Sequence, residues 1–207
     1  MTDKKADIPA EIPVPENAAA PAEGAEAEIT PDQVLGLVDG SLSFQDFFGL
    51  SDDVLLAWAN QGYFFYNQGK YSEAEVIFKG LVTLNSDISY YHTALGSIYE
   101  AQEKYDEALE EFEKALSLEK DDVCAIVNRG EILLRKGQVI EAAQEFKRAI
   151  DLDDANIQAS QDKGEPPNPD PAAQRARTLS LVTYEVLKEI ENKVKEAQER
   201  GELPTAE

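Results

Sequence analysis

The chain has 207 residues, a formal net charge of −22 and 43% hydrophobic residues. This length suits one domain with tails or one elongated array, and the hydrophobic fraction is sufficient for a core. The charge argues against binding to nucleic acid or to an anionic membrane surface, because both would repel an acidic protein. The single cysteine, Cys124, cannot form an internal disulfide and favours a reducing, cytoplasmic compartment.

The N-terminal part of the chain is acidic and poor in large apolar residues. Residues 1–29 are rich in Pro, Ala and Glu, so we expect a disordered tail there. This tail has no apolar run typical of a signal peptide, and we expect no stretch that spans a membrane. Residues 30–54 are predicted to form a short N-terminal helical segment.

A repeat of 34 residues organises the centre of the chain. An alanine recurs at this period, with a phenylalanine four residues later and a glycine twelve residues earlier. They are Ala74, Ala108 and Ala142; Phe78, Phe112 and Phe146; and Gly62, Gly96 and Gly130. Small and large residues that match three times at one period predict a repeated supersecondary unit.

This pattern resembles the tetratricopeptide repeat family, with repeats at 55–88, 89–122 and 123–156 within residues 55–156. The resemblance implies an all-α superhelix in which each repeat is a pair of antiparallel helices, and whose concave face binds partners. The glycine and the alanine allow the two helices to approach closely. Gln61 and Arg129 depart from the usual Leu, and no repeat ends in the usual Pro. Ser72 and Glu75 predict a capping box at the start of the second helix of the first repeat.

A loop and a last helix are predicted after the third repeat. Residues 157–170 have the composition of a loop, and Asp170 followed by Pro171 is a typical helix start. The helix is expected over 171–201. Its apolar stripe consists of Leu179, Val182, Val186, Ile190 and Val194. We interpret it as a helix that caps the third repeat, and a partner-binding helix is the alternative.

The aromatic residues of the first repeat are predicted to divide between the core and the groove. Trp58 and Phe65 fall at positions that are buried in the family. Tyr63 and Tyr66 fall on another stripe, which repeat geometry places on the concave groove and which also contains Leu56 and Ala59. The alternative is that both tyrosines pack on the N-terminal segment of the same chain.

The same stripe in the later repeats completes the predicted groove. It contains Tyr90, Thr93, Ser97 and Glu100 in the second repeat, and Cys124, Val127, Glu131 and Leu134 in the third. The groove is thus apolar at one end and carries two carboxylates. This favours an extended peptide with apolar anchors and a basic residue over an acidic peptide.

The first repeat and its leader resemble a narrower family, the class II chaperones of bacterial type III secretion. The resemblance rests on the GSL turn at 40–42, the FFGLSDD link at 47–53 and the sequence YNQGKY at 66–71. It implies a cytoplasmic protein that holds hydrophobic translocator proteins before their export. The concave groove would bind an extended segment near the N-terminus of the translocator. The matching pocket positions are Tyr63, Tyr66, Tyr71 and Leu84, with Phe112 behind them, whereas Ala59 replaces a usual aromatic residue.

The N-terminal segment often mediates dimerisation in that family, so the resemblance implies a possible homodimer. The candidates are Leu35, Val38, Phe44, Phe47 and Phe48. The same side chains could instead cap the first repeat.

Catalytic and metal-binding motifs are missing from the sequence. The only histidine, His92, sits at a buried type of position and is expected to pack in the core or form a local hydrogen bond. We therefore predict no enzyme activity, no cofactor and no metal site. Two functions remain, a translocator chaperone and a generic scaffold for protein–protein interaction.

Overall fold

The computed structural model describes residues 30–200, and every regular element in this range is a helix. The predicted disorder of residues 1–29 lies outside the described residues. The helices are α1 (Pro31–Asp39), α2 (Phe44–Phe47), α3 (Asp52–Asn67), α4 (Tyr71–Leu84), α5 (Ser89–Ala101), α6 (Tyr105–Leu118), α7 (Val123–Arg135), α8 (Val139–Asp162) and α9 (Pro171–Glu199).

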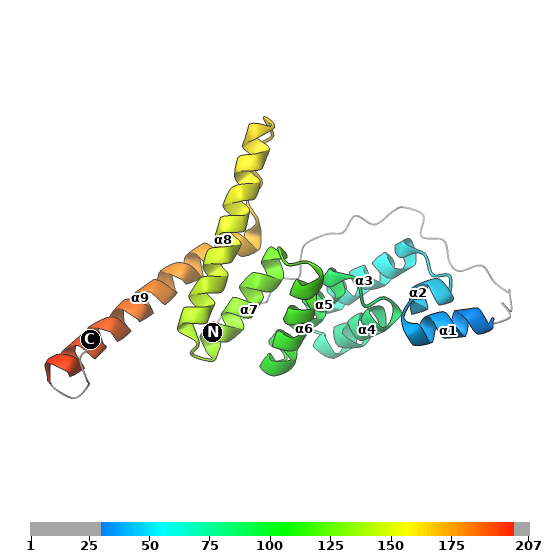
Figure 1. The fold of residues 1–207 in the computed structure, drawn as a ribbon, viewed down its shortest axis with the longest axis horizontal. Helices are drawn as coiled ribbons and strands as arrows, with labels where there is room; N and C mark the ends of the chain where they lie inside the picture. The colour runs from blue at the N-terminus through cyan, green and yellow to red at the C-terminus, as the bar shows by residue number, and fades with distance from the viewer. Residues whose placement is uncertain (1–29, 201–207) are drawn as a thin grey trace. The chain divides into compact units, whose positions relative to one another are not determined.

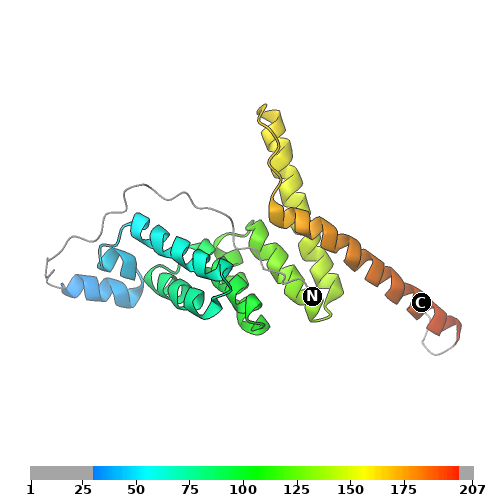
Figure 2. The same ribbon diagram turned by 180° about the vertical axis from the view of Figure 1, so that it is seen from behind.

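The chain divides into two compact units, Met1–Lys120 and Asp121–Glu207. The described part of the first unit contains α1 to α6, and that of the second contains α7 to α9. In the first unit α3 packs on α4, α5 packs on α6, and α4 also packs on α5 (Figures 1 and 2). In the second unit α7 packs on α8, and α9 packs on both. The pairs α3–α4, α5–α6 and α7–α8 correspond to the three predicted repeats.

The recurring glycines let the two helices of each pair touch. A Cβ atom on Gly62, Gly96 or Gly130 would lie 2.7, 2.6 or 2.7 Å from the ring of Phe78, Phe112 or Phe146, respectively. These three rings are fully buried. The 34-residue pattern therefore repeats one packing contact, in which a phenylalanine of the second helix fills the space left by a glycine of the first.

The capping box predicted from Ser72 and Glu75 is wrong. Helix α4 begins at Tyr71, and its N-cap, Lys70, makes no side-chain capping hydrogen bond. The carboxylate of Glu75 instead accepts a hydrogen bond from Lys79 on the same helix. It also accepts hydrogen bonds from Gln102 and Lys104, which connect α4 to the turn between α5 and α6. Burial opposes the charge of Glu75, but these donors outweigh it and lower its pKa to about 2.

Helix α8 continues six residues into the segment that was predicted to be a loop from residue 157. It ends at Asp162, and the connection to α9 spans residues 163–170. Residues 157–162 contain no Gly or Pro, so nothing in them breaks a helix, and the first breaker is Gly164. The predicted start of α9 is confirmed, because Asp170 accepts hydrogen bonds from the backbone N–H groups of Ala172 and Ala173.

Among the described helices, none combines the length and the apolar character that crossing a membrane requires.

Candidate functional site

The predicted groove residues of the first unit separate into an accessible set and a buried set. The accessible set is half-buried and consists of Leu56 and Tyr63 on α3, Tyr71 and Leu84 on α4, and Tyr90 on α5. The buried set consists of Ala59, Tyr66, Thr93, Ser97, Glu100 and Phe112. The helices that carry the accessible set pack on one another. Of these predicted groove residues, a partner could reach only the accessible set without rearrangement.

Tyr66 belongs to the core, which corrects the expectation that it faces a partner. Its side chain is 1% exposed. Leu55, Ala59, Gly62 and Tyr66 recur at steps of four, three and four residues, so they share the face of α3 that packs on α4. The ring of Tyr66 lies 5.6 Å from that of Tyr71, measured between centroids. The buried ring of Tyr66 therefore packs against the accessible ring of Tyr71.

Trp58 and Phe65 were predicted to be buried, and this is wrong for Trp58, which is 45% exposed. Phe65 is half-buried, with the Nζ atom of Lys70 5.6 Å from its ring centroid. Among the described residues, only α1 and α2 precede α3, and no helix pair covers this flank. Helix α2 reaches α3 only at its start, where Gln45 donates a hydrogen bond to Asp52.

Tyr90 is the aromatic residue that the second repeat adds to the accessible set. Its ring meets that of Phe78 in an edge-on arrangement, with centroids 6.1 Å apart. Phe78 is the buried ring that fills the glycine gap of the first repeat. Packing across the two repeats therefore holds Tyr90 in place before any partner binds.

The hydroxyl groups predicted to line the groove are used inside their own helix. Thr93 donates to the carbonyl oxygen of Ser89, and Ser97 donates to that of Thr93, at 3.4 and 2.9 Å. Both side chains are fully buried. These hydroxyl groups satisfy their own hydrogen bonds within α5, and they are not positioned to contact a ligand.

Glu131 was predicted to offer its carboxylate to a basic residue of a peptide, and the structure shows it already paired. Nε of Arg175 donates to Oε1 of Glu131 at 2.5 Å, and Nη2 of Arg175 donates to Oδ1 of Asn128 at 2.6 Å. Val127, on the same helix, is completely buried. The guanidinium of Arg175 thus occupies the carboxylate that was predicted to bind a basic residue of the peptide. The two residues are 44 positions apart in the sequence.

His92 makes the local hydrogen bonds that were predicted for it. Its Nδ1 lies 2.7 Å from Oε2 of Glu111, and its Nε2 lies 3.0 Å from the carbonyl oxygen of Ser86. The bond to Glu111 raises the pKa of His92, although burial opposes this. Burial alone would raise the pKa of Glu111, but hydrogen bonds from His92 and Lys114 hold it below its usual value. The pair joins α5 to α6 inside the second repeat.

The dimerisation candidates on α1 and α2 are largely exposed. Leu35, Val38, Phe44 and Phe48 are 61, 79, 42 and 61% exposed, and Phe47 is half-buried. Within residues 30–200, α1 packs on α2 alone, and α2 also contacts α4, so α1 does not cap the first repeat. Dimerisation through these residues stays a prediction.

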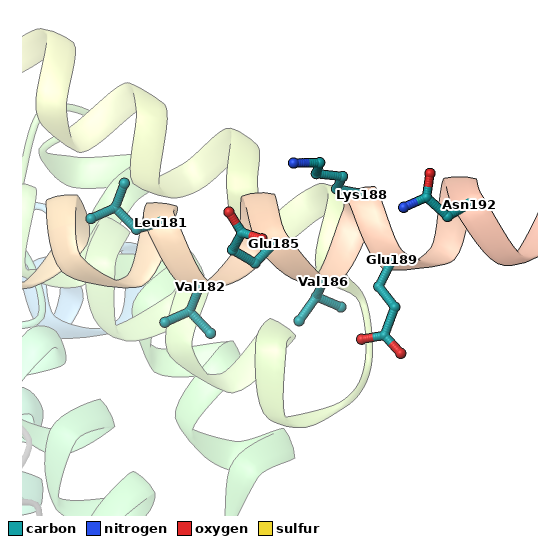
Figure 3. Close-up of a pocket in the computed structure, with 7 residues that line it drawn as sticks. All are labelled: Leu181, Val182, Glu185, Val186, Lys188, Glu189 and Asn192. Carbon is teal, nitrogen blue, oxygen red and sulfur yellow. The ribbon is translucent and has the colours of Figure 1, made fainter.

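One surface depression of the second unit lies on α9 alone. Figure 3 shows its lining residues, which are Leu181, Val182, Glu185, Val186, Lys188, Glu189 and Asn192. All seven belong to one helix, so the depression is part of a helix surface and not an enclosed pocket. Within the described residues, no three side chains of His, Cys, Asp or Glu come together in a way that could hold a metal ion.

Comparison with known proteins identifies the fold. Residues 93–157 match the model of the tetratricopeptide repeat family. No curated protein sequence matches the chain.

Three solved structures illustrate the similarity. A T3SS complex from Aeromonas hydrophila is 21% identical, with a TM-score of 0.63, and the match covers 77% of this chain and 99% of that one. The type III secretion translocator chaperone SycD from Yersinia enterocolitica is 21% identical, with a TM-score of 0.58 and coverages of 68 and 98%. PcrH, a protein of Pseudomonas aeruginosa, in complex with the chaperone binding region of PopD, is 23% identical, with a TM-score of 0.56 and coverages of 66 and 95%. The chain therefore has the tetratricopeptide repeat fold that these proteins share.

Proposed function

We propose that this chain is a cytoplasmic chaperone of type III secretion that binds an extended segment of a hydrophobic translocator protein. The observation that carries the proposal is the accessible set on α3, α4 and α5, which offers three tyrosines and two leucines. The same fold in PcrH binds the chaperone binding regions of PopD and PopB, and in SycD it binds a peptide of the translocator YopD. No catalytic step is needed for this role, which rests on binding alone.

The chemistry of the accessible set suits apolar anchors of an extended chain. A tyrosine ring buries apolar area while its hydroxyl stays in water. It can therefore contact an apolar side chain of a partner and still present a polar group to water in the unbound protein. Proteins that later enter a membrane carry apolar segments that aggregate in water. Covering one such segment keeps the cargo dispersed, and the net charge of −22 adds repulsion between complexes.

One carboxylate of the predicted groove already has a partner within the chain. Glu131 is neutralised by Arg175, so it is not a site for a cargo cation. We therefore propose that apolar anchors on the first unit, and not an ion pair with the third repeat, decide which segment binds.

The test is to recover the tagged full-length protein from its native cell and to identify by mass spectrometry the proteins that accompany it. Wild type is compared with Tyr63→Ala/Tyr90→Ala, which removes two accessible rings. We expect wild type to retain, in stoichiometric amounts, a secreted protein with long apolar segments, and the double variant to retain at least tenfold less. Two rings of this size that become buried against the cargo account for such a loss.

Phe64→Ala is the matched control, because it removes an exposed ring of α3 from outside the accessible set. It should retain the cargo as wild type does, and far-UV circular dichroism should show all three proteins to be equally helical. If folded, soluble proteins are recovered equally with all three proteins, the chain is a generic scaffold for protein–protein interaction and not a translocator chaperone.

A further inference from the structure

The accessible set has the composition of a surface that binds proline-rich segments. Its aromatic members are Tyr63, Tyr71 and Tyr90, and all three are half-buried. Buried rings hold two of them in place, because Tyr66 packs on Tyr71 and Phe78 packs on Tyr90. Aromatic surfaces of this kind bind polyproline II segments, since such a ligand is already extended and loses little conformational freedom on binding.

One segment of the chain, which lies outside the described residues, matches this surface in composition. Residues 8–15 read IPAEIPVP, in which three of the eight residues are proline. Proline fixes φ at about −65° and donates no backbone hydrogen bond, so a sequence of this kind favours polyproline II over a helix or a strand. Polyproline II repeats every three residues, so in that conformation Pro9, Ile12 and Pro15 would share one edge. Residues 8–15 thus encode an apolar edge of regular spacing.

The residues that follow have the composition of a spacer. Residues 16–29 contain four glutamates, six alanines and no basic residue. The first unit repels them, because residues 30–120 include sixteen acidic and five basic residues. Residues 8–15 carry a single charge, at Glu11. Low charge and apolar side chains therefore occur together in residues 8–15 and not in the spacer.

A cation for Glu11 lies beside the accessible set. Lys70 directly precedes Tyr71, and both residues line one surface depression of the first unit. Lys70 is exposed, and its contact with the ring of Phe65 leaves the ammonium group open to water. An exposed ion pair adds little affinity, but it favours one direction of the docked segment over the other.

The spacer is long enough for the segment to reach the accessible set. Fourteen residues separate Pro15 from Thr30, the first described residue. A chain of this length spans up to about 50 Å when extended and about 20 Å on average as a random coil. Helix α3 is about 24 Å long, and neighbouring helices lie about 10 Å apart. The tether therefore keeps the segment near α3, α4 and α5 at an effective concentration on the order of 1 mM.

We propose that residues 8–15 dock on the accessible set of the same chain, with Pro9 and Ile12 against its tyrosines and Glu11 near Lys70. The proposal rests on the part of the proposed function that makes the accessible set a peptide-binding surface. It adds that the empty protein covers this surface with its own tail. A translocator segment then binds only when the tail leaves, so the tail lowers the affinity for cargo.

The first experiment measures competition between the tail and a peptide of the same sequence. A fluorescent peptide of residues 5–17 is titrated with the full-length protein and followed by anisotropy. A tail that occupies the surface about nine-tenths of the time weakens the binding of the peptide about tenfold. Ile12→Asp in the protein places a charge on the apolar edge and should lower the dissociation constant of the peptide at least tenfold. Ala19→Asp adds the same charge to the spacer and should leave the constant within twofold of wild type.

The same titration locates the surface. In a protein that already carries Ile12→Asp, adding Tyr63→Ala/Tyr90→Ala should raise the dissociation constant of the peptide at least tenfold. Adding Phe64→Ala, which removes a ring outside the accessible set, should leave it within twofold. Far-UV circular dichroism checks that all variants are equally helical.

The second experiment detects the docked tail directly. Ile12→benzoylphenylalanine introduces a photo-crosslinker into the full-length protein, and mass spectrometry identifies the residues that it reaches. We expect cross-links within one chain to α3, α4 or α5. The same crosslinker at Ala19, in the spacer, should not concentrate its products on these helices.

Four results would overturn the inference. These are no binding of the peptide by any of the proteins, equal dissociation constants for wild type and Ile12→Asp, peptide binding that Tyr63→Ala/Tyr90→Ala leaves intact, and cross-links that join two copies or fall outside α3, α4 and α5.

Neither experiment contains a translocator, so the two proposals fail separately. A pull-down without a translocator, together with the expected cross-links, would refute the proposed function and leave the docked tail in place. A translocator recovered by wild type, together with any of the four results above, would refute the docked tail and leave the proposed function in place.

Discussion

Each of the three repeats has a tight turn whose middle residue adopts a left-handed backbone. The residues are Gly69, Glu103 and Gly137, with φ angles of +75, +62 and +78°. They are 34 positions apart, so they are equivalent in the repeat. Glycine adopts this conformation without strain, whereas a residue with a Cβ atom is disfavoured by about 1–2 kcal/mol. The second repeat thus keeps a strained residue where the others have glycine.

Glu103→Gly should stabilise the protein. The relief of strain exceeds the added flexibility of the unfolded chain, and we expect a net gain of about 0.5–1 kcal/mol. For a chain of this size the midpoint of thermal unfolding should rise by about 1–4 °C. Glu103→Ala, which keeps a Cβ atom, serves as the control and should not show the gain. An unchanged or lower midpoint for the glycine variant would show that the turn is not strained.

The hydrogen bond between His92 and Glu111 makes the stability of the second repeat depend on pH. The pKa of His92 is raised, so its contribution is complete below its usual value of 6.5 and is lost as the pH rises through the folded pKa. The pKa of Glu111 is lowered, so its contribution is complete above its usual value of 4.5 and is lost as the pH falls through the folded pKa. The pair stabilises most between these limits, at mildly acidic pH.

His92→Gln should remove this dependence. We expect the unfolding midpoint of wild type to exceed that of the variant most near pH 6, and the difference to shrink as the pH rises toward 8.5. Thermal unfolding between pH 5.5 and 8.5 measures it, and Glu111→Gln should show the same loss. A difference that stays constant across this range would mean that the pair does not titrate in the folded protein.

At the scale of the element, the two helices of a repeat are held at a distance set by one glycine and one phenylalanine. The Cβ position of Gly96 is 2.6 Å from Phe112, which is closer than two atoms can pack. Gly80, in contrast, has no atom within 4 Å of its Cβ position and is exposed on α4. The same residue type therefore has opposite roles in two helices.

Gly96→Ala and Gly80→Ala form a matched pair that tests this contact. Alanine favours a helix over glycine by about 1 kcal/mol, so Gly80→Ala should stabilise by about 0.5–1 kcal/mol. In Gly96→Ala the buried ring must move, at a cost of about 1–3 kcal/mol, so the net effect should be destabilising. Chemical denaturation monitored by circular dichroism gives both values. Equal effects of the two variants would contradict the packing role of Gly96.

At the scale of the whole molecule, the two units differ in what they offer a partner. The accessible set lies on the first unit, whereas Glu131 on the second unit is already paired with Arg175. Tyr63→Ala/Tyr90→Ala thus alters the first unit alone. The proposed cargo binding is therefore tested without changing the second unit.

Much of the fold was determined by the sequence alone, because the signals are local. The 34-residue period, the glycine–phenylalanine contact and the start of α9 at Asp170 and Pro171 each depend on residues within one helix pair or one helix end. The hydrogen bonding of His92 could also be expected, since a buried imidazole needs partners. Capping at Ser72 failed because Lys70 and the preceding turn set the start of α4.

Only the tertiary structure decided which side chains remain accessible. Tyr66 and Trp58 have their burial reversed relative to the prediction, because the burial of a helix flank depends on whether another element packs there. The pairing of Glu131 with Arg175 depends on α9 folding back across 44 residues, and no local pattern encodes that contact. The exposure of Ile190 and Val194 has the same origin, since the apolar stripe of α9 is continuous in the sequence but no residue from 184 to 200 is buried.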